Sequence, residues 1–516
     1  MDKVSLRQER VWVGFGMMCG GMFMALLDTQ VVVTSLPTIQ LALHIPRDEM
    51  SWIQTAYLIA EIISIPLTGL LMRAFGMRWL FVMAVSFFTL ASIGCAQSTG
   101  FASLIGWRIC QGLSGGALVP LVFAAVFLLF PPERQVMATT IASVLAVLAP
   151  TVGPLVGGWV TETFAWPWLF LINVVPGICA AIGGLFSLPK APLRLELFRH
   201  LDVGALLSGT GALAALEIAI KEAPTRGWAS PLVSTLLLSF VIAALFFVVR
   251  TARAPNPLVD MSAFRNRNFS IGCALSFMIG IGLYSSIYLM PIFLAYVRDH
   301  NALEIGEIML VTGVAQLACA PIVAMLLKHV DARILSAIGF LILSVGAALS
   351  ADQSRLTDFK GMLGGQLVRG CAFMFCVLPP TELALGKLDA AIIPDASGLF
   401  NLMRNLGGAV GIALADSIIF TRAPGHGQAL YNSLVAGDSG TLASLGITQD
   451  ILMQAAADPA KRPAIESVLR KVAFADAIND AWFALSICSI AIIAVLLFAE
   501  RTRAVSKISA LSPGGA

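Results

Sequence analysis

The sequence is dominated by long apolar stretches, each long enough for a helix to cross a lipid bilayer. Crossing the hydrocarbon core takes about 20 predominantly apolar residues. In lipid, a segment must satisfy its own backbone hydrogen bonds, so the sequence predicts an all-α integral membrane protein with one helix per stretch. The stretches cover approximately residues 12–38, 51–74, 77–96, 101–129, 134–160, 166–187, 203–221, 231–250, 268–297, 303–328, 331–351, 358–386, 394–420 and 481–499, which predicts fourteen transmembrane helices.

The composition excludes several other classes of protein. Charged residues make up 12% of the 516 residues, whereas soluble domains carry roughly 25%. The net charge is only +3, and the lysines and arginines do not form one basic patch that could bind nucleic acid. The nine cysteines all lie within apolar stretches and are interpreted as small apolar fillers. No H-E-x-x-H motif, P-loop or pair of catalytic residues occurs, so we expect neither a metal site nor an enzyme.

Lysine and arginine are distributed unequally between the two sides of the predicted bundle. With the N-terminus placed in the cytoplasm, the cytoplasmic segments hold 19 of them and the short outer loops hold 6. Cytoplasmic loops are enriched in these residues, so we expect both termini in the cytoplasm.

The outer loop near residues 421–480 is long, and Ile465, Val468, Leu469 and Val472 follow helical spacing. We expect an amphipathic helix there that packs over the outer mouth of the bundle.

The chain contains an internal repeat. Residues 60–78 resemble residues 315–333 at an offset of 255 residues, as expected for two six-helix halves separated by two extra helices. We therefore predict an N-terminal half over residues 1–188, a pair of linker helices over 189–255 and a C-terminal half over 256–516. Two parallel repeats around a site at the bilayer midplane are a transporter architecture.

Ionisable side chains lie inside several predicted spans. Asp28 lies in "ALLDTQVVVTSLPTIQ", and Arg108 lies in "LIGWRICQGLSGGALVP". Arg369 and Arg404 are the two other arginines within spans. A charged side chain within a bilayer is costly and usually marks a function.

The fifth span carries "APTVGPLVGGW", in which proline and glycine alternate. Proline removes a backbone hydrogen bond and kinks a helix, and glycine lets a neighbouring helix approach closely. We interpret this segment as a packed hinge or seal, with a simple helix-contact motif as the alternative. Its residues are Pro150, Gly153, Pro154, Gly157 and Gly158.

Taken in order along the chain, these motifs resemble those of a known family. "LLDTQVVVTSLPTI", "RICQG" and "APTVGPLVGG" are similar to the first-, fourth- and fifth-helix signatures of the fourteen-helix drug:H⁺ antiporters of the major facilitator superfamily, of the EmrB/QacA type. The resemblance implies the major facilitator fold, the cytoplasmic (inner) membrane and exchange of protons for hydrophobic, often cationic, compounds. It also implies that the proton gradient drives transport without a cofactor. Some relatives work with a periplasmic adaptor and an outer-membrane channel, and the sequence leaves such partners open.

Two positions depart from the pattern of that family. The loop after the second helix usually carries an acidic residue where this chain has Arg73, which follows Gly69. This change puts the usual charge-pair gating in doubt. The first-helix signature usually has an asparagine where this chain has Val33.

Three ionisable residues are predicted to couple transport to protons. Asp28 and Glu61 each lie about ten residues from the outer end of their span, which is roughly 15 Å deep at helical rise. Arg108 lies slightly nearer the surface, with a side chain long enough to reach them. A carboxyl group that changes its environment between conformations can bind a proton in one and release it in the other. The alternative for Asp28 and for Glu61 is a structural hydrogen bond between helices.

Polar and aromatic residues at similar depth are candidates for the substrate cavity, because pockets for hydrophobic ligands combine aromatic walls with a few polar groups. Glu217, Glu382 and Asp416 are weaker candidates for a functional carboxylate. We predict a proton-coupled multidrug exporter, with a dedicated carrier of one metabolite, such as a siderophore or a lipid, as the alternative. The candidate cavity residues are Gln54, Tyr57, Gln111, Tyr284, Tyr288 and Gln316.

Overall fold

The computed structural model describes residues 3–45, 49–50, 52–200, 202–254, 257–436, 438 and 462–500. All regular structure in these residues is helical, and thirteen helices are long and apolar enough to cross a membrane. This confirms the predicted all-α membrane class. One helix, α2 (Trp52–Ala96), is 45 residues long, and Gly76 within it has the non-helical angles φ 74° and ψ 160°. Gly76 therefore divides α2 into two spans, as the sequence predicted, and with this division the described residues contain fourteen.

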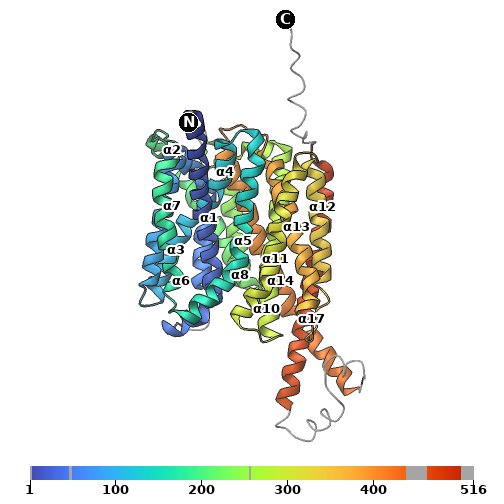
Figure 1. Cartoon of the computed structure of the whole chain (residues 1–516). Coiled ribbons are helices and arrows are strands. Elements are labelled where there is room, and N and C mark those ends of the chain that lie inside the picture. Colours follow the sequence, from blue (N-terminus) through green and yellow to red (C-terminus); the bar gives the residue numbers. More distant parts are fainter. Residues whose placement is uncertain are drawn as a thin grey trace.

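The first part of the chain forms a compact group of helices (Figure 1). Here α3 and α4 together make one span, as do α6 and α7. The elements are α1 (Lys3–Ala42), α2, α3 (Phe101–Gly115), α4 (Leu118–Leu129), α5 (Pro132–Thr163), α6 (Trp168–Leu171) and α7 (Val174–Ser187).

Two further spans, α8 and α9, follow. Asp202 caps α8 by accepting a hydrogen bond from the backbone N–H of Ala205 (2.9 Å), and it also pairs with Arg250 near the end of α9 (2.6 Å). α8 packs against α2 and α14, whereas the side chains of α9 are mostly exposed, as expected for a helix that faces lipid. The elements are η1 (Leu195–His200), α8 (Val203–Arg226), α9 (Pro231–Arg253) and η2 (Met261–Arg265).

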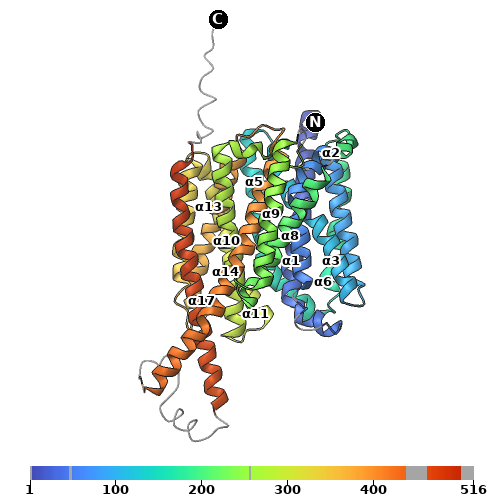
Figure 2. The same ribbon diagram turned by 180° about the vertical axis from the view of Figure 1, so that it is seen from behind.

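The last part of the chain forms a second group of helices beside the first (Figure 2). The two groups meet where α5 packs on α11 and where α14 packs on α2 and α4. The elements are α10 (Arg267–Tyr296), α11 (Ala302–Leu327), α12 (Ala332–Leu349), α13 (Phe359–Leu385), α14 (Ile393–Val435), α17 (Arg462–Ala491) and η4 (Ile492–Phe498).

The internal repeat is visible in helix packing. A side chain on Gly112 of α3 would collide with the backbone carbonyl oxygen of Tyr57, and a side chain on Gly370 of α13 would collide with that of Thr312 on α11. Tyr57 and Thr312 are separated by the 255-residue offset found in the sequence. The contact between the second and fourth spans therefore recurs between α11 and α13.

The C-terminal part of α14 and the N-terminal part of α17 project from the bundle as a hairpin. This hairpin lies on the side of the bundle opposite the N-terminus of the chain (Figure 1). Leu434 packs there against Ile465, Val468, Leu469 and Val472, so the predicted amphipathic helix is confirmed as the first part of α17. The prediction that it covers the mouth of the bundle is wrong. α14 continues without a break for 43 residues and carries the hairpin away from the mouth. Residues 437 and 439–461 of the predicted outer loop lie outside the described residues.

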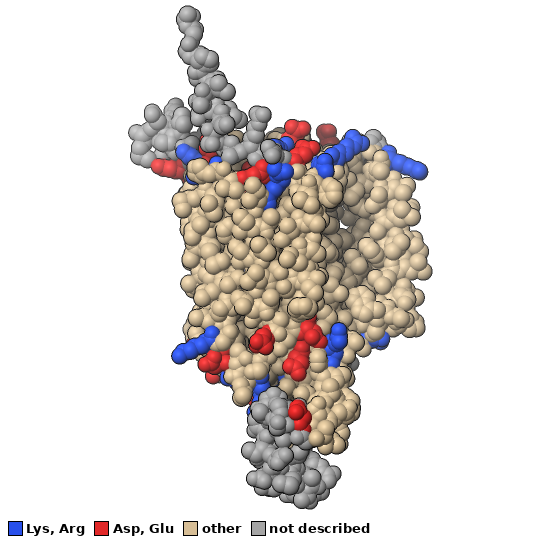
Figure 3. Space-filling view, turned by 90° about the vertical axis from the view of Figure 1, so that its right-hand side faces the viewer, with Lys and Arg blue, Asp and Glu red and all other residues tan. Residues whose placement is uncertain are grey.

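Charged side chains gather in two bands on the surface. Figure 3 shows lysine, arginine, aspartate and glutamate near the two ends of the bundle, with a broad uncharged zone between them. An uncharged zone bounded by charged rims matches the cross-section of a bilayer. Lipid is therefore the main solvent of this protein.

Candidate functional site

A buried ion pair lies in the centre of the first group of helices. Arg108 of α3 donates from Nη1 to Oδ2 of Asp28 on α1 at 2.7 Å, and both side chains are fully buried. Arg108 Nε donates to the backbone carbonyl of Ile53, and Nη2 donates to Oε1 of Gln54 at 3.0 Å. The guanidinium also lies over the ring of Tyr57, 4.3 Å from its centroid. The sequence placed Asp28 and Arg108 at similar depth, and the structure brings them into contact.

The second oxygen of Asp28 is also fully occupied. Oδ1 accepts from Nε2 of Gln111 at 2.9 Å and from Nδ2 of Asn173 at 2.7 Å. Gln111 Nε2 also donates to Oγ of Ser92, in the second span of α2. This network ties α1, both spans of α2, α3 and the start of α7 together. Sequence reasoning missed Asn173 and Ser92, because an isolated amide or hydroxyl in an apolar run gives no signal of its partner.

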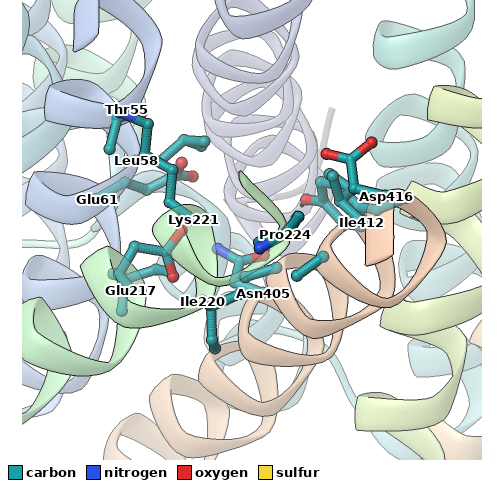
Figure 4. A pocket seen from close by; sticks show the side chains of 14 residues that line it. Thr55, Leu58, Glu61, Glu217, Ile220, Lys221, Pro224, Asn405, Ile412 and Asp416 are labelled. Atoms are coloured by element: carbon teal, nitrogen blue, oxygen red, sulfur yellow. Dashed lines mark hydrogen bonds between the residues drawn. The ribbon is translucent and has the colours of Figure 1, made fainter. Parts of the chain in front are cut away.

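A separate pocket of about 170 Å³ lies between α2, α8, α10 and α14. Figure 4 shows Glu61 and Glu217 on one side of it and Asp416 on the other. Glu61 and Glu217 are 6% and 7% exposed. The remaining lining is largely apolar, with Lys221 as its one cationic side chain. Apolar walls with a few charged groups are typical of a binding pocket.

The polar groups of this pocket differ in how they are held. Tyr284 donates to Oδ1 of Asn405 at 3.4 Å. The hydroxyl of Tyr288 donates to Asp416. Among the described residues, Oε2 of Glu217 has no hydrogen-bond partner. Lys221 packs on the ring of Trp52, with Nζ 4.0 Å from its centroid.

The predicted cavity residues lie in three different places. Tyr288 donates to the pocket residue Asp416. Tyr284 lines the pocket. Gln54, Tyr57 and Gln111 instead contact Arg108 within the buried network. Gln316 is buried in α11, and neither of its side-chain polar atoms has a hydrogen-bond partner among the described residues.

Sequence reasoning singled out Glu217 and Asp416 only as weaker candidates, and it missed Lys221 and Asn405. α8, which follows the first group of helices along the chain, brings Glu217 and Lys221 to the pocket. Their spacing of four residues puts both side chains on one helix face, which is the only signal that the sequence carries.

The two groups of helices are sealed against each other at the end where the N-terminus lies. Arg73 of α2 forms an ion pair with Asp395 in the first turn of α14, which is 1% exposed. Nearby, Ser397 donates from Oγ to the backbone carbonyl of Pro120 on α4 at 2.7 Å. The guanidinium of Arg404 lies over the ring of Phe123, 5.4 Å from its centroid. Arg73, which departs from the family pattern, therefore has an acidic partner on the opposite helix group.

The proline- and glycine-containing segment of α5 lies at the second contact between the helix groups. α5 remains helical from Pro132 to Thr163 and packs on both α1 and α11. Gly153 faces the side chain of Gln30 on α1, and Gly306 and Gly313 of α11 face Leu155 and Thr151. The five residues of the predicted seal motif, Pro150, Gly153, Pro154, Gly157 and Gly158, are all buried.

Two packed helix groups, with a largely apolar pocket that carries a few charged groups between them, define a membrane protein with the architecture of a secondary transporter. The sequence matches the family model "Major Facilitator Superfamily" over residues 18–412. The chain belongs to the major facilitator superfamily.

The chain is similar to proteins named for drug resistance and for multidrug export. The "Colistin resistance protein EmrB" of Acinetobacter baumannii is 36% identical over 411 residues, covering 79% of this chain and 80% of that protein. The "Multidrug export protein EmrB" of Escherichia coli K12 is 29% identical over 419 residues, covering 80% and 81%. Among solved structures, the human organic anion transporter MFSD10 superposes with a TM-score of 0.60 at 15% identity, covering 94% of this chain and 99% of that one. The last similarity shows the fold alone.

Proposed function

We propose that this protein exports hydrophobic, often cationic, compounds in exchange for protons by alternating access. The observation that carries the proposal is the pocket between α2, α8, α10 and α14, with the carboxyl groups of Glu61, Glu217 and Asp416 in largely apolar walls. A lipophilic cation gains both from the apolar walls and from the carboxylates. A proton competes with the cation for the same negative charge.

Within this proposal, Glu61 is the group that exchanges its proton. It lines the pocket, and no cation lies within ion-pair distance of it among the described residues. Asp28 has hydrogen-bond or ion-pair partners at both oxygens. The main role of the pair of Asp28 and Arg108 in this proposal is therefore structural, because it holds together the helices that position Glu61. That Asp28 itself takes part in proton coupling remains a prediction.

Alternating access requires seals that open in turn. In this conformation Arg73 and Asp395 close the end of the bundle at which the N-terminus lies. We propose that this end is cytoplasmic, with both termini inside, because the lysines and arginines favour that orientation. The contact of α5 with α11 is the proposed hinge and seal between the halves.

The test is substrate-induced proton movement in proteoliposomes that contain the purified full chain. Ethidium and a panel of other lipophilic compounds would be added to vesicles holding a proton gradient. We expect several unrelated compounds to dissipate the gradient, and protein-free vesicles to show no effect. A response to one compound alone would favour the dedicated carrier of a metabolite such as a siderophore or a lipid. No response to any compound would contradict the proposal.

We also propose that the exporter works without a cofactor and is not an enzyme, because exchange needs only the pocket and the proton gradient.

In cells a periplasmic adaptor and an outer-membrane channel are the proposed partners. The hairpin of α14 and α17 projects from the bundle on the proposed periplasmic side, where an adaptor would reach it. If such partners are needed, deleting the channel abolishes drug resistance in cells but leaves exchange in proteoliposomes unchanged. Unchanged resistance in the deletion strain would contradict this partnership.

A further inference from the structure

The C-terminal half contains a counterpart of the buried network around Arg108. The matching contacts of Gly112 and Gly370 place Arg108 and Gln111 of α3 in the positions of Gln366 and Arg369 of α13. The two halves thus use the same two residue types in opposite order along the helix. The serine partner is also repeated. Ser92 accepts from Gln111 at 2.9 Å, and Ser350 accepts from Nη1 of Arg369 at 2.6 Å.

One component of the network differs between the halves, namely the carboxylate. Arg108 is paired with Asp28, but no carboxylate among the described residues lies within ion-pair distance of Arg369. Arg369 is nevertheless only 2% exposed, and its guanidinium lies over the ring of Trp482, 4.1 Å from the centroid. When applied to α1 and α10, the 255-residue offset takes Asp28 to Leu283, which cannot supply a charge.

A small cavity of about 20 Å³ lies beside Arg369, where this offset places the counterpart of the Asp28 carboxylate. Its polar lining comes from four helices, α5, α10, α11 and α13, and contains no acidic residue. Leu283 lies in the wall of this cavity, and the polar groups of the wall belong to Thr151, Ser286, Thr312, Gln366 and Arg369.

Two buried donors in these walls lack a partner among the described residues, namely Nε of Arg369 and Nε2 of Gln366. Gln366 already accepts from the hydroxyl of Thr312 with its oxygen, at 3.3 Å, so its amide N–H groups remain to be satisfied. The hydroxyl groups of Thr151, Ser286 and Thr312 already donate to other acceptors. The guanidinium and the amide, without a carboxylate nearby, remain as a pair of donors that suits an anion. A buried cation without a counter-charge is strongly disfavoured.

We propose that this cavity binds one small monatomic anion of the size of chloride, which takes the place of the Asp28 carboxylate in the C-terminal half. The cavity has room for one small occupant, since a single water needs about 10–15 Å³, and the unpartnered donors favour an anion in that place. The carboxylate of a larger organic anion would bring a body for which the cavity has no room. Because Thr151 of α5 forms part of the wall, the anion sits at the contact between the helix groups. This inference does not depend on which compounds the protein exports.

The test is the thermal unfolding of the purified full chain in sodium chloride and in sodium gluconate at equal ionic strength. We expect the Tm of the wild type to rise with chloride concentration and to saturate, because a ligand that binds only the folded state stabilises it. Gln366→Glu places a carboxylate in the cavity, so its Tm should no longer respond to chloride. The control Gln135→Glu adds the same charge at a half-buried site in α5 outside the cavity, and its Tm should respond as the wild type does.

Two results would overturn the proposal. An equal Tm of the wild type in both salts would mean that the cavity holds water. An unchanged chloride response in Gln366→Glu would mean that chloride binds elsewhere. If Gln366→Glu does not fold, quenching of tryptophan emission by bromide replaces it as the measurement. The wild type should then show a saturable component that Trp482→Phe lacks, and a purely linear response in both proteins would contradict the site.

Discussion

Removing the charge of Asp395 should open the end of the bundle at which the N-terminus lies. Asp395→Asn breaks the ion pair with Arg73, whose side chain is 28% exposed while that of Asp395 is 1% exposed. Exposed pairs contribute about 0–1 kcal/mol, and breaking fully buried pairs costs about 3–5 kcal/mol. This pair lies between these limits, so we expect a loss of about 1–3 kcal/mol, which shifts the equilibrium between closed and open forms by about 5- to 150-fold.

The assay is the distance between spin labels at Glu133 and Asp389, measured by double electron–electron resonance in a background without the native cysteines. Both residues are exposed at that end of the bundle, Glu133 in the first turn of α5 and Asp389 in the connection between α13 and α14. We expect a longer distance to become populated in Asp395→Asn. Exchanging the two charges, with Arg73→Asp and Asp395→Arg together, should restore the shorter one.

A matched control is Asp260→Asn. Asp260 lines a cavity together with Arg73 and Asp395, so this change removes a neighbouring carboxylate and leaves both charges of the ion pair in place. Asparagine can still accept the hydrogen bond that Asp260 receives from the backbone N–H of Ser262. The distribution of distances between the two spin labels in Asp260→Asn should match that of the wild type. An unchanged distribution in Asp395→Asn would refute the reasoning, because the pair would then contribute nothing to closure.

Three further changes test other parts of the structure. Asp28→Asn leaves Arg108 buried without its counter-charge, so the protein should lose about 3–5 kcal/mol of stability; an unchanged Tm would show that the network does not hold the helices. Gly76→Ala should lower the stability by about 1–3 kcal/mol, because the turn within α2 needs a φ of 74° and a ψ of 160°, which essentially only glycine adopts, and denaturation that matches the wild type would contradict this. Glu217→Gln should weaken export of cations more than export of neutral compounds, whereas Glu222→Gln on the same helix, outside the pocket, should not; equal effects of the two changes would remove Glu217 from the site.

The helices and their order could be predicted from the sequence, because each apolar run carries its own signal. Gly76 illustrates this point, since the two runs on either side of it were recognisable although the structure joins them into one helix. The pairing of Asp28 with Arg108 was also predictable, because their depths follow from helical rise and a buried charge needs a partner.

Contacts between distant segments were not predictable in the same way. Arg73 was recognised as unusual, but its partner Asp395 is 322 residues away, and nothing local marks it. Glu61 was expected to share a layer with Asp28, yet the structure puts it on the pocket face of α2. Depth along a helix follows from the count of residues, whereas the direction of a side chain depends on neighbours that one sequence does not reveal.

In the proposed exchange, a cation and a proton compete for Glu61. The most direct measurement is the release of protons when ethidium is added to the purified protein in weakly buffered detergent solution, followed with a pH-sensitive dye. We predict that the wild type releases protons in proportion to the ethidium bound, and that Glu61→Gln releases far fewer per cation bound. Equal release from both proteins would contradict the claim and would move the exchangeable proton to another group.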